Sequence, residues 1–254
     1  MNLTPHFPPC RTRIVAATAG IVFVFATVIT LAAEPRGENA TMQWIGQHGL
    51  EAWHEDSGDW IVCKSAQPSP SNPHLLTTIP GQGTLVNGPI GRTVNLLSDY
   101  QHADVEAHVE FLVSKDSNSG VYFQGRYEIQ ILDSWGVKNP KSSDCGGIYK
   151  RWKNDHGFEG HPPRVNACRR PGEWQTYDVI FRAPRFDTTG RKIANARFVK
   201  VIHNGVLIHE NVELTGPTRA STFDDEQPRG PLMLQGDHGP VAYRNITIKP
   251  LATN

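Results

Sequence analysis

Hydrophobic and polar residues alternate along several short stretches of the chain. Between residues 105 and 113 the odd positions are apolar, and Glu106, His108 and Glu110 lie between them. Residues 174–181 alternate in the same way. A period of two residues is typical of a β-strand with one face in the core and one face in water. Both stretches therefore predict strands of an antiparallel sheet.

Two further stretches extend this pattern toward the C-terminus. Residues 196–210 place an Asn-Gly pair at 204–205 between two apolar runs, which is a strong signal for a tight β-hairpin. Residues 243–251 predict one more strand. No stretch after Ala33 keeps the 3.6-residue period of a helix. The predicted fold class is all-β, a two-sheet antiparallel jelly-roll sandwich.

The segment 66–91 interrupts the pattern because it is rich in proline and glycine. We expect a long irregular connection here, inside one domain that covers residues 34–254. Too few residues precede the segment to form a domain of their own.

The N-terminal residues differ in kind from the rest. Arg11 and Arg13 precede an uncharged apolar run over residues 14–33, which ends in two alanines. This pattern predicts a secretory signal peptide over residues 1–33 and a periplasmic or secreted protein. The run is also long enough to span a bilayer, so an uncleaved anchor is the alternative, and only then would a membrane be a partner.

Charge and cysteine content narrow the possible partners. The chain contains 25 Lys and Arg residues and 25 Asp and Glu residues. The net charge of zero argues against a nucleic-acid partner.

Cys145 and Cys168 enclose a Gly- and Pro-rich stretch, and we expect a disulfide between them. Zinc bound with His156 and His161 is the alternative, although no CxxC pair supports it. Cys63 reads as a buried free thiol. The oligomeric state cannot be inferred.

The densest group of chemically active side chains lies in the segment NSGVYFQGRYEIQIL. Alternation places Glu128 and Gln130 on one face of a strand, and Tyr122 and Gln124 on one face of the strand before it, with Arg126 nearby. A carboxylate, amides and a phenol on one sheet surface are suited to binding a sugar ring. The alternative is an ordinary solvated sheet face.

A second group lies in the phrase LQGDHG. It contains Gln235, followed by Asp237 and His238 on a glycine-flanked turn. An acid and an imidazole side by side can serve as acid, base or metal ligands. Alternatively, the aspartate bonds its own backbone and the histidine is exposed without a role.

The order of several phrases resembles one known family. NSGVYFQGRYEIQILD, GGIYK, PPRVNACRRPGEWQTYDVIF, VIHNGVLI and GPLMLQGDHGPVAYRNITIKPL are together similar to the 3-keto-disaccharide hydrolase domain, formerly called domain of unknown function 1080. The resemblance covers about residues 42–251. It implies a concanavalin-A-like jelly roll, export, and action on glycosides whose C3 hydroxyl is already a ketone.

The resemblance also implies a mechanism. The ketone acidifies the C2 hydrogen, a base removes it, the group at C1 leaves by elimination, and water adds to the resulting enone. This differs from a glycosidase with two carboxylates. A lectin-like module that binds sugar without cleaving it is the competing hypothesis, because fold does not fix function.

Roles for individual residues follow from matching the family's phrases. Glu128 or His238 would be the base, and Lys150 or Arg126 would supply positive charge to the enolate. A divalent metal bound by Glu128, Asp237 and His238 is a further possibility. The residues expected to bind substrate are Tyr122, Gln124, Arg126, Gln130, Asp133, Asn166, Gln235 and Asp237. Because the phrase LQGDHG has an extra glycine, either Asp237 or His238 can occupy the family's position.

Overall fold

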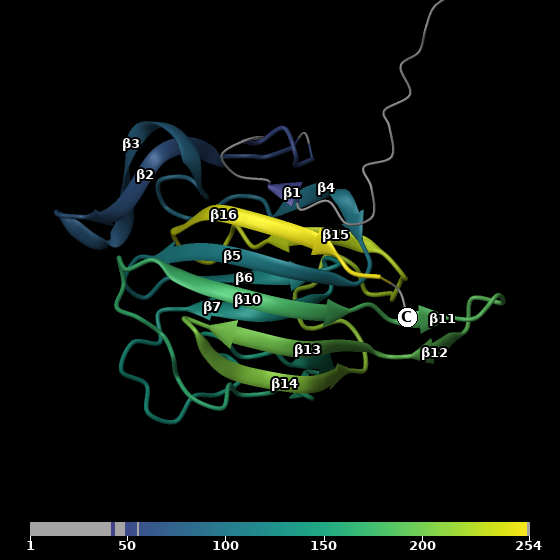
Figure 1. Ribbon diagram of the computed structural model, residues 1–254. Coiled ribbons are helices and arrows are strands. Elements are labelled where there is room, and N and C mark those ends of the chain that lie inside the picture. The colour runs from purple at the N-terminus through teal and green to yellow at the C-terminus, as the bar shows by residue number, and fades with distance from the viewer. Residues whose placement is uncertain (1–41, 44–48, 55, 253–254) are drawn as a thin grey trace, which may run out of the picture. The chain divides into compact units, whose positions relative to one another are not determined.

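A computed structural model describes residues 42–43, 49–54 and 56–252, and Figure 1 shows them as strands in antiparallel sheets. No helix occurs among these residues, which confirms the predicted all-β class. Accordingly, none of the described segments is an apolar helix of membrane-spanning length. The signal peptide predicted over residues 1–33 lies outside the described residues.

The larger sheet has the strand order β14-β13-β10-β5-β16-β3-β2, and β1 also pairs with β16. Its strands are β1 (Met42–Gln43), β2 (Ile61–Ser69), β3 (Asn72–Val86), β5 (Val105–Val113), β10 (Gln175–Arg182), β13 (Ala196–His203), β14 (Val206–Leu214) and β16 (Val241–Pro250).

The smaller sheet has the order β4-β15-β6-β7 and lies behind the larger one in Figure 1. Its strands are β4 (Leu96–His102), β6 (Asn118–Phe123), β7 (Tyr127–Leu132) and β15 (Gly230–Leu234). Two ribbons complete the described fold, namely β8 (Arg151–Lys153) with β9 (His156–Phe158), and β11 (Arg185–Phe186) with β12 (Lys192–Ala194). This arrangement is the predicted sandwich.

The core fills the space between the two sheets. The Phe181 ring on β10 lies 5.3 Å from Phe123 on β6, 5.5 Å from Tyr127 on β7 and 5.5 Å from Phe198 on β13, measured between ring centroids. All four side chains are fully buried. Burying one such side chain contributes roughly 1.5–3 kcal/mol. The inward faces of β6 and β7 are therefore fixed by packing, which holds their outward faces in register.

The Asn-Gly signal is confirmed. Residues 204–205 join β13 to β14, with φ of 51° at Asn204 and 80° at Gly205. Two consecutive positive φ values are the geometry of a type I′ turn, whose twist matches that of the flanking strands.

The irregular connection expected over residues 66–91 is wrong for most of its length. Strands β2 and β3 form a long hairpin here, with register shifts near Cys63 and Pro68. Pro68 and Pro73 are tolerated because β2 pairs only with β3, so a missing backbone N–H can face solvent. Cys63 is buried and free, as expected.

The disulfide expected between Cys145 and Cys168 is absent, since both are free thiols. The two thiols contact each other, and each has further partners. The Cys145 amide donates to Ser134 Oγ at 3.0 Å, and Cys145 Sγ lies 3.2 Å from the Tyr177 hydroxyl. Asn166 Oδ1 accepts the Cys168 amide at 3.0 Å. Hydrogen bonds therefore hold the segment that we expected a disulfide to close.

Candidate active site on the outer face of the smaller sheet

Three buried side chains form a row across the outer face of the smaller sheet. Tyr122 on β6 is directly opposite Glu128 on β7 and Met233 on β15. Tyr122 and Met233 are fully buried, and Glu128 is 3% exposed. The inward-facing neighbours of this row belong to the core, so alternation directs the row away from it. The face predicted for Tyr122, Glu128 and Gln130 is therefore present, although it is not solvated.

A second row lies next to the first. Gly120 pairs with Gln130, and the Gln235 amide donates to the Gly120 carbonyl at 3.0 Å. The row thus consists of Gln130, Gly120 and Gln235. Because Gly120 has no side chain, there is a gap between the side chains of Gln130 and Gln235. The Glu128 carboxyl fills this gap. A β-carbon on Gly120 would lie 3.0 Å from Glu128 Cδ and 2.9 Å from Tyr122 Cε2.

Burial controls the protonation of Glu128. It raises the pKa of the carboxyl to about 8, and the hydrogen bond with Tyr122 lowers that pKa in part. Burial and the nearby carboxylate of Glu128 both raise the pKa of Tyr122 well above its ordinary value. Tyr122 therefore remains a phenol that can donate a hydrogen bond, while Glu128 can lose or gain a proton near neutral pH.

Gln130 contributes an acceptor without a partner. Its Nε2 donates to the Ser143 carbonyl at 3.2 Å, whereas its Oε1 is buried and has no hydrogen-bond partner among the described residues. A buried acceptor left unsatisfied costs about 1–3 kcal/mol. A substrate hydroxyl is the kind of group that would remove this cost.

A loop extends the smaller sheet beyond β7 and contains Lys150, whose Nζ lies 5.7 Å from the centroid of the Trp152 ring. The Gln130 amide donates to the Gly147 carbonyl at 2.8 Å, and the Tyr149 amide donates to the Glu128 carbonyl at 3.3 Å. These bonds fix Tyr149 and Lys150 beside the edge of β7. Tyr149 also raises the pKa of Tyr122, so the two hydroxyls lie within electrostatic range.

A second segment covers the same edge and was missed by the sequence analysis. Thr218 Oγ1 accepts the Glu128 amide at 3.2 Å, and the Arg219 amide donates to the Lys150 carbonyl at 2.9 Å. The Tyr122 hydroxyl lies 3.4 Å from the Arg219 carbonyl. Residues 216–222 show no periodicity that could have indicated this position.

Asp237 and His238 lie at the rim. Their side chains are 52% and 45% exposed, and His238 Nδ1 lies 2.5 Å from Asp237 Oδ1. Arg92 donates to the Asp237 carbonyl at 2.6 Å, which fixes the turn.

No cluster of three potential metal ligands occurs among the described residues. The metal set of Glu128, Asp237 and His238 is therefore not assembled, because the first is buried with Tyr122 and the other two pair with each other. The zinc set with His156 and His161 is not assembled either.

Gln124 and Arg126 belong to the turn between β6 and β7. Gln124 has a φ of 56°, and its Nε2 donates to the carbonyls of His102 and Pro228 at 3.2 and 3.1 Å. The expectation that Gln124 shares a face with Tyr122 is therefore wrong. Arg126 is 3% exposed, and its Nη2 lies 2.5 Å from Asp225 Oδ1. Its guanidinium is bonded to Asp225 and to the Gln124 carbonyl and has no bond with Glu128.

Asp133 and Asn166 hold loops. Asp133 accepts the amides of Asp116 and Trp135 at 3.0 and 3.3 Å, which closes the end of β7. Asn166 Nδ2 donates to the Ser134 and Val137 carbonyls at 2.7 and 2.9 Å. These bonds hold the loop after β7 to the segment that contains Asn166.

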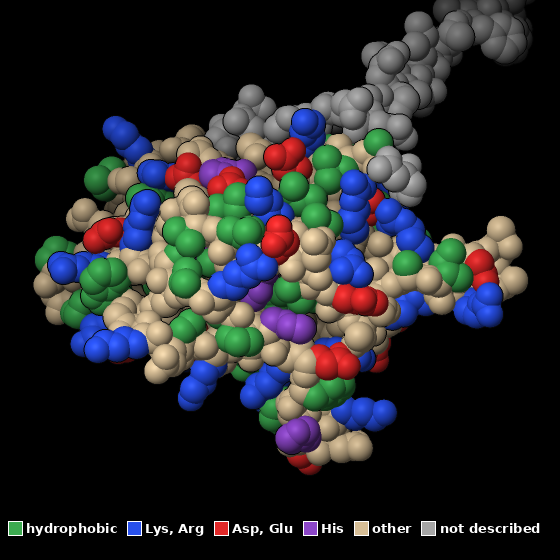
Figure 2. Space-filling view, turned by 60° about the horizontal axis from the view of Figure 1, so that its bottom comes forward, with side chains coloured by type: hydrophobic (Ala, Val, Ile, Leu, Met, Phe, Trp, Pro, Cys, Tyr) green, Lys and Arg blue, Asp and Glu red, His purple; other side chains and the backbone are tan. Residues whose placement is uncertain are grey.

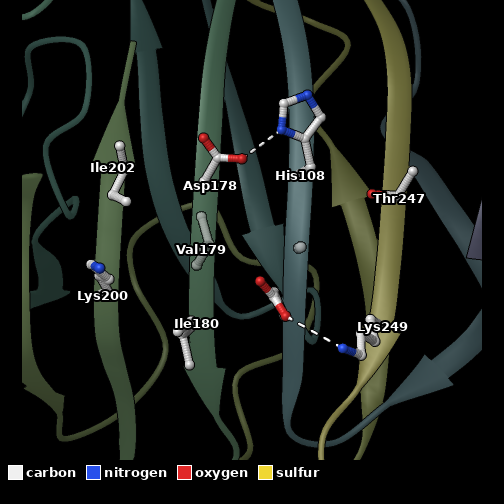
Figure 3. A pocket seen from close by; sticks show the side chains of 10 residues that line it. His108, Asp178, Val179, Ile180, Lys200, Ile202, Thr247 and Lys249 are labelled. Atoms are coloured by element: carbon white, nitrogen blue, oxygen red, sulfur yellow. Dashed lines mark hydrogen bonds and ion pairs between the residues drawn. The ribbon is translucent and has the colours of Figure 1, made fainter. Parts of the chain in front are cut away.

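The outer face of the larger sheet contains a hollow of about 410 Å³, shown in Figure 3. Among the described residues, four of its five ionisable side chains are paired, and Lys200 forms no ion pair. His108 Nδ1 lies 2.6 Å from Asp178 Oδ1, and Lys249 Nζ lies 4.0 Å from Glu106 Oε2. Over the described surface visible in Figure 2, basic side chains are scattered among acidic ones. The buried Glu128 carboxyl, with its raised pKa, and the Gln130 acceptor without a partner lie instead on the smaller sheet, and we place the candidate site there.

Comparisons with known proteins agree with this fold. In Parabacteroides distasonis ATCC 8503, a protein provisionally assigned as a glycosyl hydrolase has a crystal structure that is 27% identical, with a TM-score of 0.60, over 83% of this chain and 84% of that one. A second protein from that organism, with the same provisional assignment, is 18% identical with a TM-score of 0.53, over 84% of this chain and 100% of that one, and shows the same fold. No curated protein matches the chain.

A sequence model of one family covers most of the described residues. The family is described as the 3-keto-alpha-glucoside-1,2-lyase-like domain, and it matches residues 46–249. Together with the first Parabacteroides protein, this match supports a carbohydrate-active function. The ordered phrases of the sequence already resembled the same family. The chain belongs to the family of 3-keto-alpha-glucoside-1,2-lyase-like domains.

Proposed function

We propose that this protein is an enzyme that cleaves 3-keto-glycosides by elimination, on the face formed by Tyr122, Glu128 and Gln130. The observation that carries the proposal is a buried carboxyl group with a pKa of about 8 beside an amide oxygen without a partner. Sugar binding alone does not require a carboxyl whose pKa is shifted into the neutral range, whereas acid–base catalysis does.

The chemistry follows from the ketone at C3. The Glu128 carboxylate takes the proton from C2, and the electron pair of that bond forms an enolate with the ketone. The enolate collapses, the C1–O bond breaks and the leaving oxygen takes a proton, which leaves an enone. Addition of water to C1 and return of a proton to C2 complete a net hydrolysis. Every proton and electron pair is thus accounted for without an oxidant or reductant.

The neighbouring side chains fit the other demands of this reaction. Tyr122 lies within hydrogen-bonding distance of the carboxyl group and stays protonated, so it is suited to donate to the enolate oxygen. Gln130 Oε1 can accept a sugar hydroxyl. Asp237 and His238 are exposed at the rim, where a proton for the leaving oxygen is needed.

A deuterium experiment tests the mechanism. A 3-keto-glucoside incubated with the protein in D₂O should release a 3-keto-sugar that carries deuterium at C2. The unoxidised glucoside should remain intact. Direct displacement at C1 would retain the original hydrogen at C2, and this outcome would contradict elimination. A sample without protein corrects for spontaneous exchange beside the ketone.

Variants connect the reaction to the site. Glu128→Gln keeps the shape of the side chain and should lower the rate by about 10²–10⁴-fold. Glu106→Gln, on the exposed face of β5, is the matched control and should keep the rate. If the protein binds 3-keto-glycosides without cleaving them, it is a lectin-like module instead.

The proposal of export rests on the sequence. We propose that residues 1–33 are removed and that the protein is periplasmic or secreted. The intact mass of the protein purified from its native host should then correspond to a chain that begins near Glu34. A mass that includes residues 1–33, found in the membrane fraction, would support the anchor.

A further inference from the structure

Two cationic side chains lie over one exposed tryptophan beside the proposed site. Arg219 Cζ lies 4.0 Å from the centroid of the Trp152 ring, and Lys150 Nζ lies 5.7 Å from the same centroid. Trp152 is 40% exposed. Two cations held at one exposed ring present a binding surface for an anion.

The local backbone builds this arrangement. A β-carbon on Gly157 would lie 2.9 Å from Lys150 Cε, and a β-carbon on Gly160 would lie 3.0 Å from Lys150 Cβ. The two glycines therefore leave room for the lysine side chain to lie along the β8–β9 ribbon. The hydrogen bond from the Arg219 amide to the Lys150 carbonyl joins the segments that carry the two cations.

Neither cation has an acidic partner. Among the described residues, Lys150 and Arg219 form no ion pair, whereas the neighbouring Arg151 lies 3.2 Å from Glu159. Each cation therefore lies near the same ring without a counter-ion. An anion bound there would form charge-assisted hydrogen bonds.

The cation pair adjoins the proposed catalytic face. The Arg219 carbonyl lies 3.4 Å from the Tyr122 hydroxyl. Tyr149, next to Lys150 in the chain, donates its amide to the Glu128 carbonyl. The segments that carry the two cations are therefore bonded directly to the strands that carry Tyr122 and Glu128.

We infer that Arg219, Lys150 and Trp152 form a subsite for an anionic substituent, a carboxylate or sulfate, on the glycoside substrate. This inference rests on the proposed function, because the substrate is assumed to occupy the Glu128 face. Arg219 is the specificity-determining residue, since its guanidinium forms two parallel hydrogen bonds with such groups.

Three substrates of one linkage test the subsite. The first is the neutral p-nitrophenyl 3-keto-glucoside, the second carries a carboxylate on the aromatic leaving group, and the third carries one at C6 of the sugar. We expect kcat/KM for one charged substrate to exceed that of the neutral one about tenfold or more. If the substrate with the charged leaving group is preferred, the leaving group reaches Arg219. If the substrate charged at C6 is preferred, the sugar reaches Arg219.

The variant Arg219→Gln should abolish the preference, so that kcat/KM for the charged substrate falls to the value for the neutral one. Arg170→Gln is the matched control, because Arg170 lies 5.2 Å from the exposed ring of Trp135 in another loop. It should retain the preference. Equal rates for all three substrates with the unaltered protein, or an equal loss on all three in Arg219→Gln, would overturn the subsite.

Binding measurements separate this inference from the proposed function. The same three glycosides with an ordinary C3 hydroxyl can be titrated by calorimetry. If no keto substrate is cleaved but the charged glycoside binds more tightly, and Arg219→Gln removes that difference, the reaction is wrong and the subsite stands. If binding is the same for charged and neutral glycosides, the subsite is wrong whatever the rates.

Discussion

The carboxyl group of Glu128 occupies the space that a side chain at position 120 would fill. A β-carbon on Gly120 would lie 3.0 Å from Glu128 Cδ. The backbone of Gly120 is an ordinary strand with a negative φ, which any residue can adopt. Contact with the carboxyl is therefore the reason for a glycine here, and backbone strain is not.

The first prediction concerns Gly120→Ala. The added methyl group must displace the Glu128 carboxyl or the Tyr122 ring. We expect turnover of a 3-keto-glucoside to fall at least tenfold and the free energy of unfolding to fall by about 1–3 kcal/mol, as in other overpacked sites. Steady-state kinetics and denaturant unfolding measure the two effects.

A double-mutant cycle checks the origin of that loss. If Gly120→Ala acts through Glu128, its effect on the rate should be much smaller in the Glu128→Gln background than in the unaltered protein. Additive effects would show that Gly120 influences the reaction by another route.

The second prediction concerns stability and pH. Burial raises the pKa of Glu128 from 4.5 to about 8, so the folded protein holds a proton there that the unfolded chain releases. Stability from this group is full below about pH 4.5 and is lost as pH rises through 8. The stability of Glu128→Gln relative to the unaltered protein should rise by about 1.4 kcal/mol per pH unit in that window. Urea unfolding at pH 5, 7 and 9 tests this, and a constant difference would contradict it.

The third prediction concerns the pH dependence of the rate. A base must be ionised to accept a proton, so kcat/KM should increase with pH and level off above about 8. A rate that decreases through pH 8 would instead make Glu128 the acid. His238→Ala should leave the pH at which kcat/KM rises unchanged.

The fourth prediction separates Tyr122 from Glu128. The hydrogen bond with Tyr122 lowers the pKa of Glu128. Tyr122→Phe removes that bond and should shift the rising limb of the pH–rate profile to higher pH. Loss of the enolate donor should also lower the plateau. A lower plateau with an unmoved limb would show that the phenol acts on the substrate alone.

The fifth prediction concerns a buried ion cluster away from the site. Asp104 is 2% exposed, and it accepts hydrogen bonds from Arg182 at 2.7 Å and from Arg185 at 2.6 and 2.9 Å. Asp104→Asn leaves two half-buried cations without an acidic partner and should lower the free energy of unfolding by about 1–3 kcal/mol. Activity at low temperature should be retained. A thermal melt together with an assay at 10 °C would distinguish the two effects.

Alternation alone was sufficient to predict the face that carries Glu128 and Gln130. The pattern could not locate the end of β6, and Gln124 was assigned to the strand although it lies in the turn. Gly120 offered a usable signal, because a glycine inside a strand often marks a close approach of another group. The sequence analysis did not use it.

The rest of the site depends on long-range contacts that no local pattern encodes. Arg219 is brought to Lys150 by backbone hydrogen bonds between irregular segments. The β2–β3 hairpin was missed for a different reason. Its prolines were taken as breakers, yet an edge ribbon tolerates them because its outer N–H groups need no partner.

Strand β16 is the latest of the described strands in the chain, yet it lies inside the larger sheet between β5 and β3 and also pairs with β1. A chain that emerges residue by residue from a ribosome or a translocation channel therefore exposes an unpaired edge of β5 until residues 241–250 arrive. Such an edge is a template for aggregation. Removal of β16 should therefore leave the edge of β5 open to pairing with other chains and lower the solubility of the product.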